Sequence, residues 1–292
     1  MTGDRVPALV EPDWLEARLG EPDLRVLDCT VHLDFDPETG ARRSESGRGD
    51  WERAHVPGSA FADIPGALSA TDPDYPYQRP SPERFADAME ALGVGDDSRV
   101  VCYDSEGNGW AARVWWLLRA FGFDRAGVLN GGWNRWTAEG RPVSAAPPTE
   151  REVTFTPDPR PELFVEKEAV LEAIDDEACC LVDALRPADH DGTGLVKYGR
   201  PGRIPGSVNV PAVGEDAIVD PGDDTYLPRG ALRERFDEAG ATDGDRVIAY
   251  CGGGIAASSA AFALHLLGVE DVAVYDGSLA EWGRTDLPME TG

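Results

Sequence analysis

The sequence predicts an α/β fold made of two tandem domains, each with a mainly parallel β-sheet flanked by helices. Three observations support this prediction. The chain has 292 residues, 41% of them hydrophobic, which is enough to bury the cores of two domains of ordinary size. Short apolar runs alternate with helical patterns, as they do in βαβ units. The same order of motifs also occurs twice along the chain.

Each copy of the repeat starts with a short apolar strand and a turn. Leu24–Cys29 precedes A-H-V-P-G-S in the first half, and Cys180–Ala184 precedes G-R-I-P-G-S in the second. Further along, the predicted buried strands Val100–Tyr103 and Val247–Tyr250 each lead through a loop into a helix-like run. Each copy ends on a glycine turn followed by a tryptophan. The order of these motifs indicates a duplicated domain.

The copies are long enough to bury separate cores, unlike the units of a solenoid. We therefore expect an N-terminal domain over residues 1–145, a linker over residues 146–162 and a C-terminal domain over residues 163–292. The linker is rich in proline, which favours an extended, semi-rigid connection.

The charge balance argues against two classes of partner. The chain carries 54 acidic and 27 basic residues, a formal net charge of −27. A surface of this charge repels nucleic acid and anionic membranes. The acidic residues are dispersed along the chain, so we interpret them as a solvation device. A salt-rich cytoplasm, as in a halophile, would screen their mutual repulsion.

Cysteine and histidine positions predict neither a metal site nor disulfides. The five cysteines and four histidines include no pair at metal-ligand spacing. We therefore expect no metal, no cofactor and free thiols in a reducing cytoplasm. The sequence has no apolar run of about 20 residues, the length of a membrane span, and no apolar leader behind a basic flank. We expect a soluble cytoplasmic protein.

Comparison of the two halves identifies one candidate nucleophile. Aligning V-V-C-Y with V-I-A-Y places Asp104 opposite Cys251, so only the second half has kept a thiol there. Consecutive glycines after Cys251 let the loop curl tightly, and the N-terminus of the next helix points at the same place. Oriented backbone amides favour the thiolate, which is the nucleophilic form of cysteine. The predicted stabilising loop consists of Gly252, Gly253, Gly254, Ile255 and Ala256.

Two other kinds of site fit parts of this pattern. Gly252, Gly254 and Ala257 match the dinucleotide fingerprint G-x-G-x-x-A after a strand. That fingerprint normally opens a domain, however, and here it lies close to the end of the sequence. A cysteine phosphatase needs an arginine six positions after its cysteine to clamp phosphate, and that position is Ala257. The shorter loop of this chain suits an atom the size of sulfur rather than a phosphate group.

The pattern resembles the tandem-domain rhodanese and mercaptopyruvate sulfurtransferase family over nearly the whole chain. The motifs that carry the resemblance are H-V-P-G-S at His55, R-V-W-W at Arg113, R-I-P-G-S at Arg203, D-G-S at Asp276 and the Cys251 loop. The resemblance implies two rhodanese-like domains, of which the N-terminal one is inactive. It also implies that Cys251 takes sulfur from a small donor as a persulfide, held by loop amides, and passes it to cyanide or a thiol.

The resemblance leaves the donor open between 3-mercaptopyruvate and thiosulfate. Thiosulfate-preferring members have basic residues at the second and third loop positions, whereas mercaptopyruvate members have glycine and serine. This chain has Gly252 and Gly253, which favours the carboxylate donor. The family also uses arginines that precede the second P-G-S turn, so Arg186 and Arg200 are the candidate donor-binding residues, with Lys197 third. A sulfur-carrier or redox-sensing module with little turnover is the alternative function.

Overall fold

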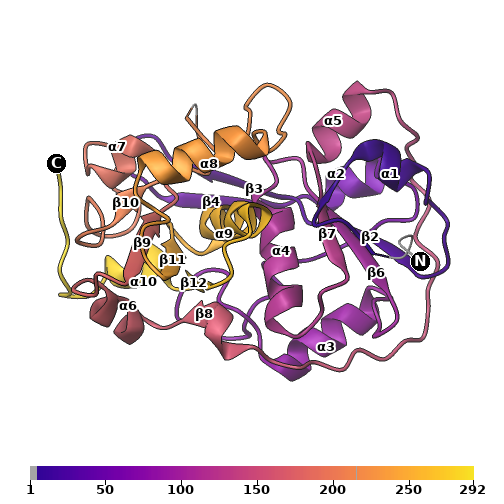
Figure 1. Cartoon of the computed structure of the whole chain (residues 1–292). Coiled ribbons are helices and arrows are strands. Elements are labelled where there is room, and N and C mark those ends of the chain that lie inside the picture. Colours follow the sequence, from indigo (N-terminus) through magenta and orange to yellow (C-terminus); the bar gives the residue numbers. More distant parts are fainter. Residues whose placement is uncertain (1–4, 215) are drawn as a thin grey trace.

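The computed structural model describes residues 5–214 and 216–292. Over these residues the chain forms two five-stranded sheets and a two-stranded hairpin. Every strand pair within the two larger sheets is parallel. In Figure 1 the N-terminal half, coloured indigo to magenta, lies beside the C-terminal half, coloured orange to yellow, and helices flank both sheets. The predicted α/β fold with two mainly parallel sheets is confirmed.

The first sheet has the strand order β1-β7-β6-β2-β5. Its strands are β1 (Leu9–Val10), β2 (Leu24–Asp28), β5 (Ala60–Phe61), β6 (Arg99–Tyr103) and β7 (Ala126–Leu129). Its helices are α1 (Pro12–Glu16), α2 (Arg48–Arg53), α3 (Pro82–Ala91), α4 (Gly109–Ala120) and α5 (Gly132–Ala138). The central strand β6 is buried along its whole length, as expected for a continuous apolar run in a parallel sheet.

The second sheet has the order β10-β9-β11-β12-β8, which is the same topology as the first. Its strands are β8 (Phe164–Val165), β9 (Cys179–Asp183), β10 (Val208–Asn209), β11 (Arg246–Tyr250) and β12 (Val272–Tyr275). The helical segments are η1 (Pro161–Leu163), α6 (Lys167–Ala173), α7 (Pro187–His190), α8 (Arg229–Glu238), α9 (Ile255–Leu267) and α10 (Ser278–Trp282). No helix among the described residues is long and apolar enough to cross a membrane.

A tyrosine–serine contact explains why P-G-S appears in both copies. Ser59 Oγ lies 3.1 Å from Tyr103 Oη at the end of β6, and Ser207 Oγ lies 2.7 Å from Tyr250 Oη at the end of β11. In each copy the tyrosine oxygen also accepts a hydrogen bond from the backbone N–H that opens the turn. Both groups are buried and therefore need partners. The contact fixes the P-G-S turn against the central strand, next to the loop that follows that strand.

The larger of the two hydrophobic clusters among the described residues is shared by both domains, although the sequence predicts a separate core for each; the smaller cluster, around Leu15 and Trp136, belongs to the N-terminal domain alone. A continuous cluster of buried side chains runs from the first sheet through α4 and α9 to the second sheet. At its centre the rings of Trp115 and Phe262 meet edge to face, with centroids 4.8 Å apart. Both helices are buried on nearly all sides, which explains why their sequences are apolar around the whole circumference. The N-terminal domain is therefore packed firmly against its partner.

An antiparallel hairpin, formed by β3 (Val31–Phe35) and β4 (Arg42–Ser46), joins the domains a second time. It leaves the N-terminal sheet after β2 and runs toward the C-terminal half (Figure 1). There the ring of Phe35 meets the ring of Tyr198 edge to face, with centroids 5.8 Å apart. No motif predicted this hairpin, which forms one wall of the cavity that contains Cys251.

Candidate active site

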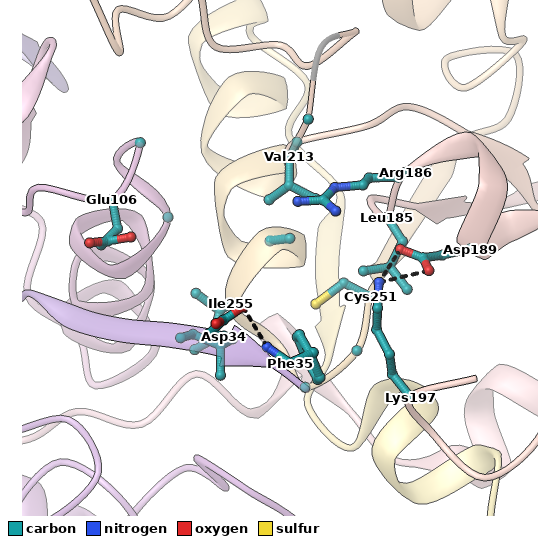
Figure 2. A pocket seen from close by; sticks show the side chains of 18 of the residues that line it. Asp34, Phe35, Glu106, Leu185, Arg186, Asp189, Lys197, Val213, Cys251 and Ile255 are labelled. Atoms are coloured by element: carbon teal, nitrogen blue, oxygen red, sulfur yellow. Dashed lines mark hydrogen bonds and ion pairs between the residues drawn. The ribbon is translucent and has the colours of Figure 1, made fainter. Parts of the chain in front are cut away.

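Cys251 lies at the bottom of a cavity between the two domains. It follows β11 directly, at the carboxyl end of the C-terminal sheet, where α/β proteins gather their ligand sites. The cavity has a volume of about 850 Å³ and is lined by the hairpin, by the loop before α4 and by the segments after β9 and β11. Figure 2 shows the sulfur of Cys251 facing this space, with Ile255 and Phe35 nearby. The thiol is therefore within reach of a small molecule, although only 2% of the residue is exposed.

The loop after Cys251 needs glycine at two positions. Gly254 caps α9 with φ of 82°, a left-handed conformation that side chains rarely adopt. At Gly252 an added Cβ would lie 2.1 Å from the phenol oxygen of Tyr198. Tyr198 therefore fills the space in which a side chain at position 252 would stand. Any larger residue there would require this ring to move.

Ser278 holds both ends of the loop. Its Oγ accepts hydrogen bonds from the backbone N–H groups of Cys251 (3.1 Å) and Gly254 (3.2 Å) and donates one to the carbonyl of Tyr275 (2.8 Å). Ser278 is fully buried and has φ of 48°, a strained value for a residue with a side chain. Sequence reasoning noted this serine only as a letter of the D-G-S motif. Its role depends on β12 lying beside β11, which the letters alone do not show.

The remaining amides of the loop belong to residues that line the cavity. Among the described residues, none accepts a hydrogen bond from the backbone N–H of Gly252, Gly253, Ile255 or Ala256. These amides include the first turn of α9, whose N–H groups have no partner within the helix. Free amides at a helix N-terminus bind negative charge. Four of the five predicted loop residues therefore offer an amide next to Cys251 that no described residue uses, and the amide of the fifth, Gly254, is bound to Ser278.

The equivalent loop of the N-terminal domain shows what such a site binds. Asp104 occupies the position of Cys251, and its carboxylate accepts hydrogen bonds from the N–H groups of Glu106 (2.7 Å), Asn108 (3.0 Å) and Ala111 (2.7 Å). Burial raises the pKa of Asp104 to about 6 despite these three bonds. In this domain the loop therefore holds an anion supplied by its own chain.

Cationic side chains line the cavity on the side of Cys251. Arg186 packs along Gly214, and Figure 2 shows its guanidinium beside Val213, on the same side of the cavity as Cys251. Lys197 also lines the cavity, but its Nζ lies 2.8 Å from both carboxylate oxygens of Asp189. Arg186 is consequently the better-placed candidate for binding a donor anion.

Arg200 does not reach the cavity. Its guanidinium donates hydrogen bonds to the carbonyls of Trp282 (3.3 Å), Gly283 (3.4 Å) and Leu287 (2.8 Å), at the end of α10 and beyond it. Arginine has several donors in a rigid fork, and here they fix the C-terminal segment. The expectation that Arg200 binds the donor is therefore not supported by its position.

Comparison with known proteins agrees with the geometry. A model of the rhodanese-like domain matches residues 11–139 and residues 166–285. The chain belongs to the rhodanese-like family. The 3-mercaptopyruvate sulfurtransferase of Escherichia coli (strain K12) is 33% identical to it over 295 residues, covering 96% of this chain and 97% of that protein. The thiosulfate sulfurtransferase of Mus musculus is 36% identical over 295 residues, covering 97% of this chain and 94% of the relative.

A solved structure extends the likeness to three dimensions. The crystal structure of the 3-mercaptopyruvate sulfotransferase SseA from Escherichia coli superposes with a TM-score of 0.79 at 28% identity, covering 94% of this chain and 99% of that one. Together with the curated relatives, this identifies the rhodanese-like chain as a sulfurtransferase.

The other cysteines of this rhodanese-like enzyme lie away from the cavity. All five cysteines are free thiols. Cys251 is the only cysteine among the described residues that line the cavity. Cys29 and Cys102 neighbour each other in the N-terminal sheet, and burial raises the pKa of Cys29 well above its usual value. Cys179 and Cys180 belong to β9. A redox sensor built on Cys251 would therefore lack a resolving thiol in the cavity.

Proposed function

We propose that this sulfurtransferase carries sulfane sulfur as a persulfide on Cys251. The observation that supports this most strongly is the contrast between the two equivalent loops. One binds the carboxylate of Asp104 with three backbone amides, and in the other Cys251 is followed by amides that have no partner among the described residues. The outer sulfur of a persulfide anion carries the same unit of negative charge as that carboxylate. The second loop suits this charge for the same reason as the first.

The reaction consists of two displacements at sulfur. The Cys251 thiolate first attacks the transferable sulfur of the donor, so that an S–S bond forms and the donor's bond to that sulfur breaks. The departing electron pair leaves on sulfite if the donor is thiosulfate. It leaves on an enolate, which takes a proton to become pyruvate, if the donor is 3-mercaptopyruvate. Cyanide or a thiolate then attacks the outer sulfur, and the electron pair returns to Cys251.

The loop amides lower the barrier by stabilising charge on sulfur in both steps. They are fixed before the reaction, because Ser278 and Gly254 set the loop conformation. Preorganised donors of this kind lose little energy to reorganisation when charge develops. We assign this role to the amides of Gly252, Gly253, Ile255 and Ala256, with Gly254 shaping the turn.

We favour 3-mercaptopyruvate as the donor, with thiosulfate as the second candidate. The ring of Tyr198 fills the space beside Gly252 that a basic side chain would need, so the loop offers no cation to a doubly charged donor. Arg186 is the residue to which we assign the single carboxylate. Thiocyanate formation from cyanide, measured separately with each donor, tests this choice. A kcat/KM at least as high for thiosulfate would contradict it.

Cys251→Ser tests the nucleophile itself. The variant retains the shape of the buried side chain and should fold normally, but it cannot form a persulfide. We expect no detectable thiocyanate production with either donor. Cys180→Ser, which removes a half-buried thiol outside the cavity, is the matched control and should retain activity. Thiocyanate production by Cys251→Ser would contradict the proposed mechanism.

We further propose that the N-terminal domain, the linker and the C-terminal domain span residues 1–145, 146–162 and 163–292. We also propose that the protein works in a salt-rich cytoplasm, which its salt dependence can test. The net charge of −27 and the free thiols support this second proposal. Its expected consequence is a thermal unfolding midpoint that rises with potassium chloride concentration. A midpoint that is independent of salt would contradict it.

A further inference from the structure

A buried ion pair crosses the domain interface directly behind the catalytic loop. Arg113 from α4 of the N-terminal domain places Nη2 2.6 Å from Oδ1 of Asp276, which follows β12 in the C-terminal domain. The side chains are 0% and 1% exposed. Burying two charges carries a large desolvation cost, so such a pair is weak evidence of stabilisation by itself. Stabilisation of the fold alone therefore does not explain why an ion pair is buried at this place.

The pair touches the loop at Gly254. A Cβ added at this glycine would lie 3.1 Å from Asp276 Oδ1 and 3.2 Å from Arg113 Nη1. The second carboxylate oxygen of Asp276 accepts a hydrogen bond from the N–H of Arg79 (2.7 Å), and Arg113 Nη2 donates to the carbonyl of Tyr77 (2.8 Å). Nη1 of Arg113, the atom nearest the loop, has no hydrogen-bond partner among the described residues. The guanidinium is thus held through Nη2, while Nε and Nη1 have no hydrogen-bond partner among the described residues and Nη1 lies on the side of the loop.

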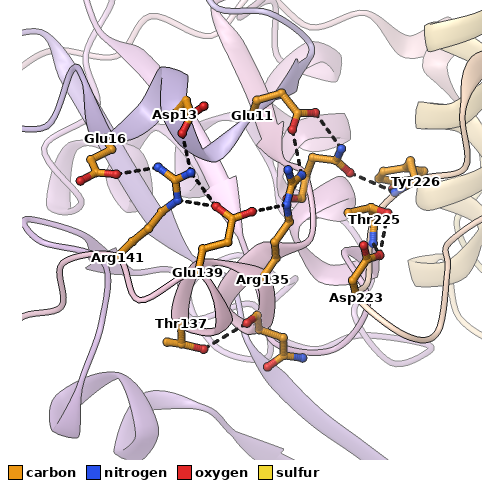
Figure 3. Close-up of polar contacts among 12 residues, drawn as sticks. Glu11, Asp13, Glu16, Arg135, Thr137, Glu139, Arg141, Asp223, Thr225 and Tyr226 are labelled. Atoms are coloured by element: carbon orange, nitrogen blue, oxygen red, sulfur yellow. Dashed lines mark hydrogen bonds and ion pairs between the residues drawn. The ribbon is translucent and has the colours of Figure 1, made fainter.

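The interface behind the Asp104 loop has no charged side chain at the equivalent positions. Ser259 stands at the same place in α9 as Arg113 in α4, and Asn130 follows β7 as Asp276 follows β12. Tyr226 joins them with neutral hydrogen bonds, from its N–H to Asn130 Oδ1 (3.0 Å) and between its hydroxyl and Ser259 Oγ (2.8 Å). Figure 3 shows the contact at the backbone of Tyr226. Packing at this interface therefore does not require a buried ion pair in the copy where aspartate replaces the cysteine.

We propose that Arg113 is a positioning residue for Cys251, supplied by the domain that lacks a nucleophile. It holds Asp276 against Gly254, which keeps the loop in its anion-binding shape. It also neutralises a buried carboxylate that would otherwise oppose the negative charge on the Cys251 sulfur. This inference rests on Cys251 being the nucleophile. It gives the silent domain a part in the chemistry through α4.

Other charged or titratable groups also face Cys251. Tyr198 lies over Gly252, and the cavity is lined by basic and acidic side chains: Arg42, Arg186, Lys197, Arg284, Asp34, Glu106, Asp189 and Asp224. These groups remain unchanged in the variants proposed below. A difference between the variants therefore reports on the ion pair.

The test uses two substitutions that unbalance the pair in opposite directions. Arg113→Met leaves the carboxylate alone behind the loop, and Asp276→Asn leaves the guanidinium alone while retaining an acceptor for Arg79. Alkylation of Cys251 by iodoacetamide, followed on its peptide by mass spectrometry, measures the thiolate population as a function of pH. We expect the midpoint of the alkylation rate to rise by about one pH unit in Arg113→Met and to fall in Asp276→Asn. We also expect kcat of Arg113→Met to fall roughly tenfold while the donor KM changes about twofold or less.

Arg99→Met is the matched control. Arg99 is another arginine of the N-terminal domain, 7% exposed and paired with Glu21 and Asp23, but it does not line the cavity. This variant should lose stability without shifting the alkylation midpoint. Arg113→Lys keeps the charge and should recover part of the lost kcat. If Arg113→Met does not fold, the downward shift in Asp276→Asn carries the test.

The inference fails if Arg113→Met and Asp276→Asn move the midpoint in the same direction, or if neither differs from Arg99→Met. Either outcome would make the pair a structural element only. Failure of the proposed function is recognised separately, because Cys251→Ser would then remain active. An inactive Cys251→Ser combined with unshifted midpoints refutes the role of Arg113 alone.

Discussion

Replacing Ser278 with alanine removes the one acceptor that both ends of the catalytic loop share. Its Oγ accepts from the N–H groups of Cys251 and Gly254, and it is fully buried. A buried polar group left without a partner costs about 1–3 kcal/mol. Two amides therefore give a loss of about 2–6 kcal/mol, and we expect about 3 kcal/mol because water can enter from the cavity. The displaced loop should lower kcat by roughly tenfold to a hundredfold.

Ser278→Gly separates the loss of the acceptor from the strain of the backbone. It leaves the same two amides unpaired, but it relieves a left-handed φ of 48°, which costs about 1 kcal/mol for a residue with a side chain. The N-terminal domain has Gly132 with φ of 51° at this position. Ser278→Gly should therefore unfold at a higher urea concentration than Ser278→Ala, while both show the same fall in kcat. Wild-type kcat in either variant would refute the role given to Ser278.

Three further substitutions have distinct signatures. Arg186→Ala should raise the KM for 3-mercaptopyruvate roughly tenfold with little change in kcat, because the carboxylate is bound equally in the ground and transition states; an unchanged KM would return Arg186 to the surface. Arg200→Ala should leave that KM unchanged and lower the free energy of unfolding by about 2 kcal/mol, since three carbonyls lose a donor; a raised KM would restore Arg200 to the donor site. Burial lowers the pKa of His265 from 6.5 to about 4, with the charge of Arg119 as a second cause. The unfolded chain binds the proton more readily, so stability present above pH 6.5 is lost as the pH falls toward 4, and His265→Gln should lose less over this window in denaturation experiments; equal losses would contradict the assignment.

The sequence predicted the duplication, the parallel sheets and the candidate nucleophile. These depend on local patterns: apolar runs, turns and the difference between Asp104 and Cys251 at the end of a central strand. The loop residues could also be predicted, because consecutive glycines between a strand and a helix indicate a tight turn at that place.

The features that escaped prediction depend on contacts between distant segments. The ring of Tyr198 occupies the space beside Gly252, and Ser278 reaches the loop because β12 pairs with β11. Arg200 is an arginine that precedes the second P-G-S turn, as the resemblance requires of a donor-binding residue, but the end of α10 and the segment after it supply three carbonyls that use its donors. The charge of a side chain and its position in the sequence do not reveal which groups it binds in the folded protein.

The shared core escaped prediction for a related reason. The apolar character of α4 and α9 is visible in the sequence, but each helix was assigned to its own domain. The contact of Trp115 with Phe262 shows that the two helices bury each other. A helix that is apolar on all sides needs cover on all sides, and the second domain provides it. The same packing brings Arg113 to Asp276.

The most direct test of the central claim is to find the transferred sulfur on the enzyme. The reduced protein is incubated with 3-mercaptopyruvate in the absence of an acceptor, digested without reductant and analysed by mass spectrometry. The account predicts the added mass of one sulfur atom on the peptide that contains Cys251 and its disappearance when cyanide is supplied. Sulfur found on another cysteine, or turnover without any sulfur on Cys251, would contradict it.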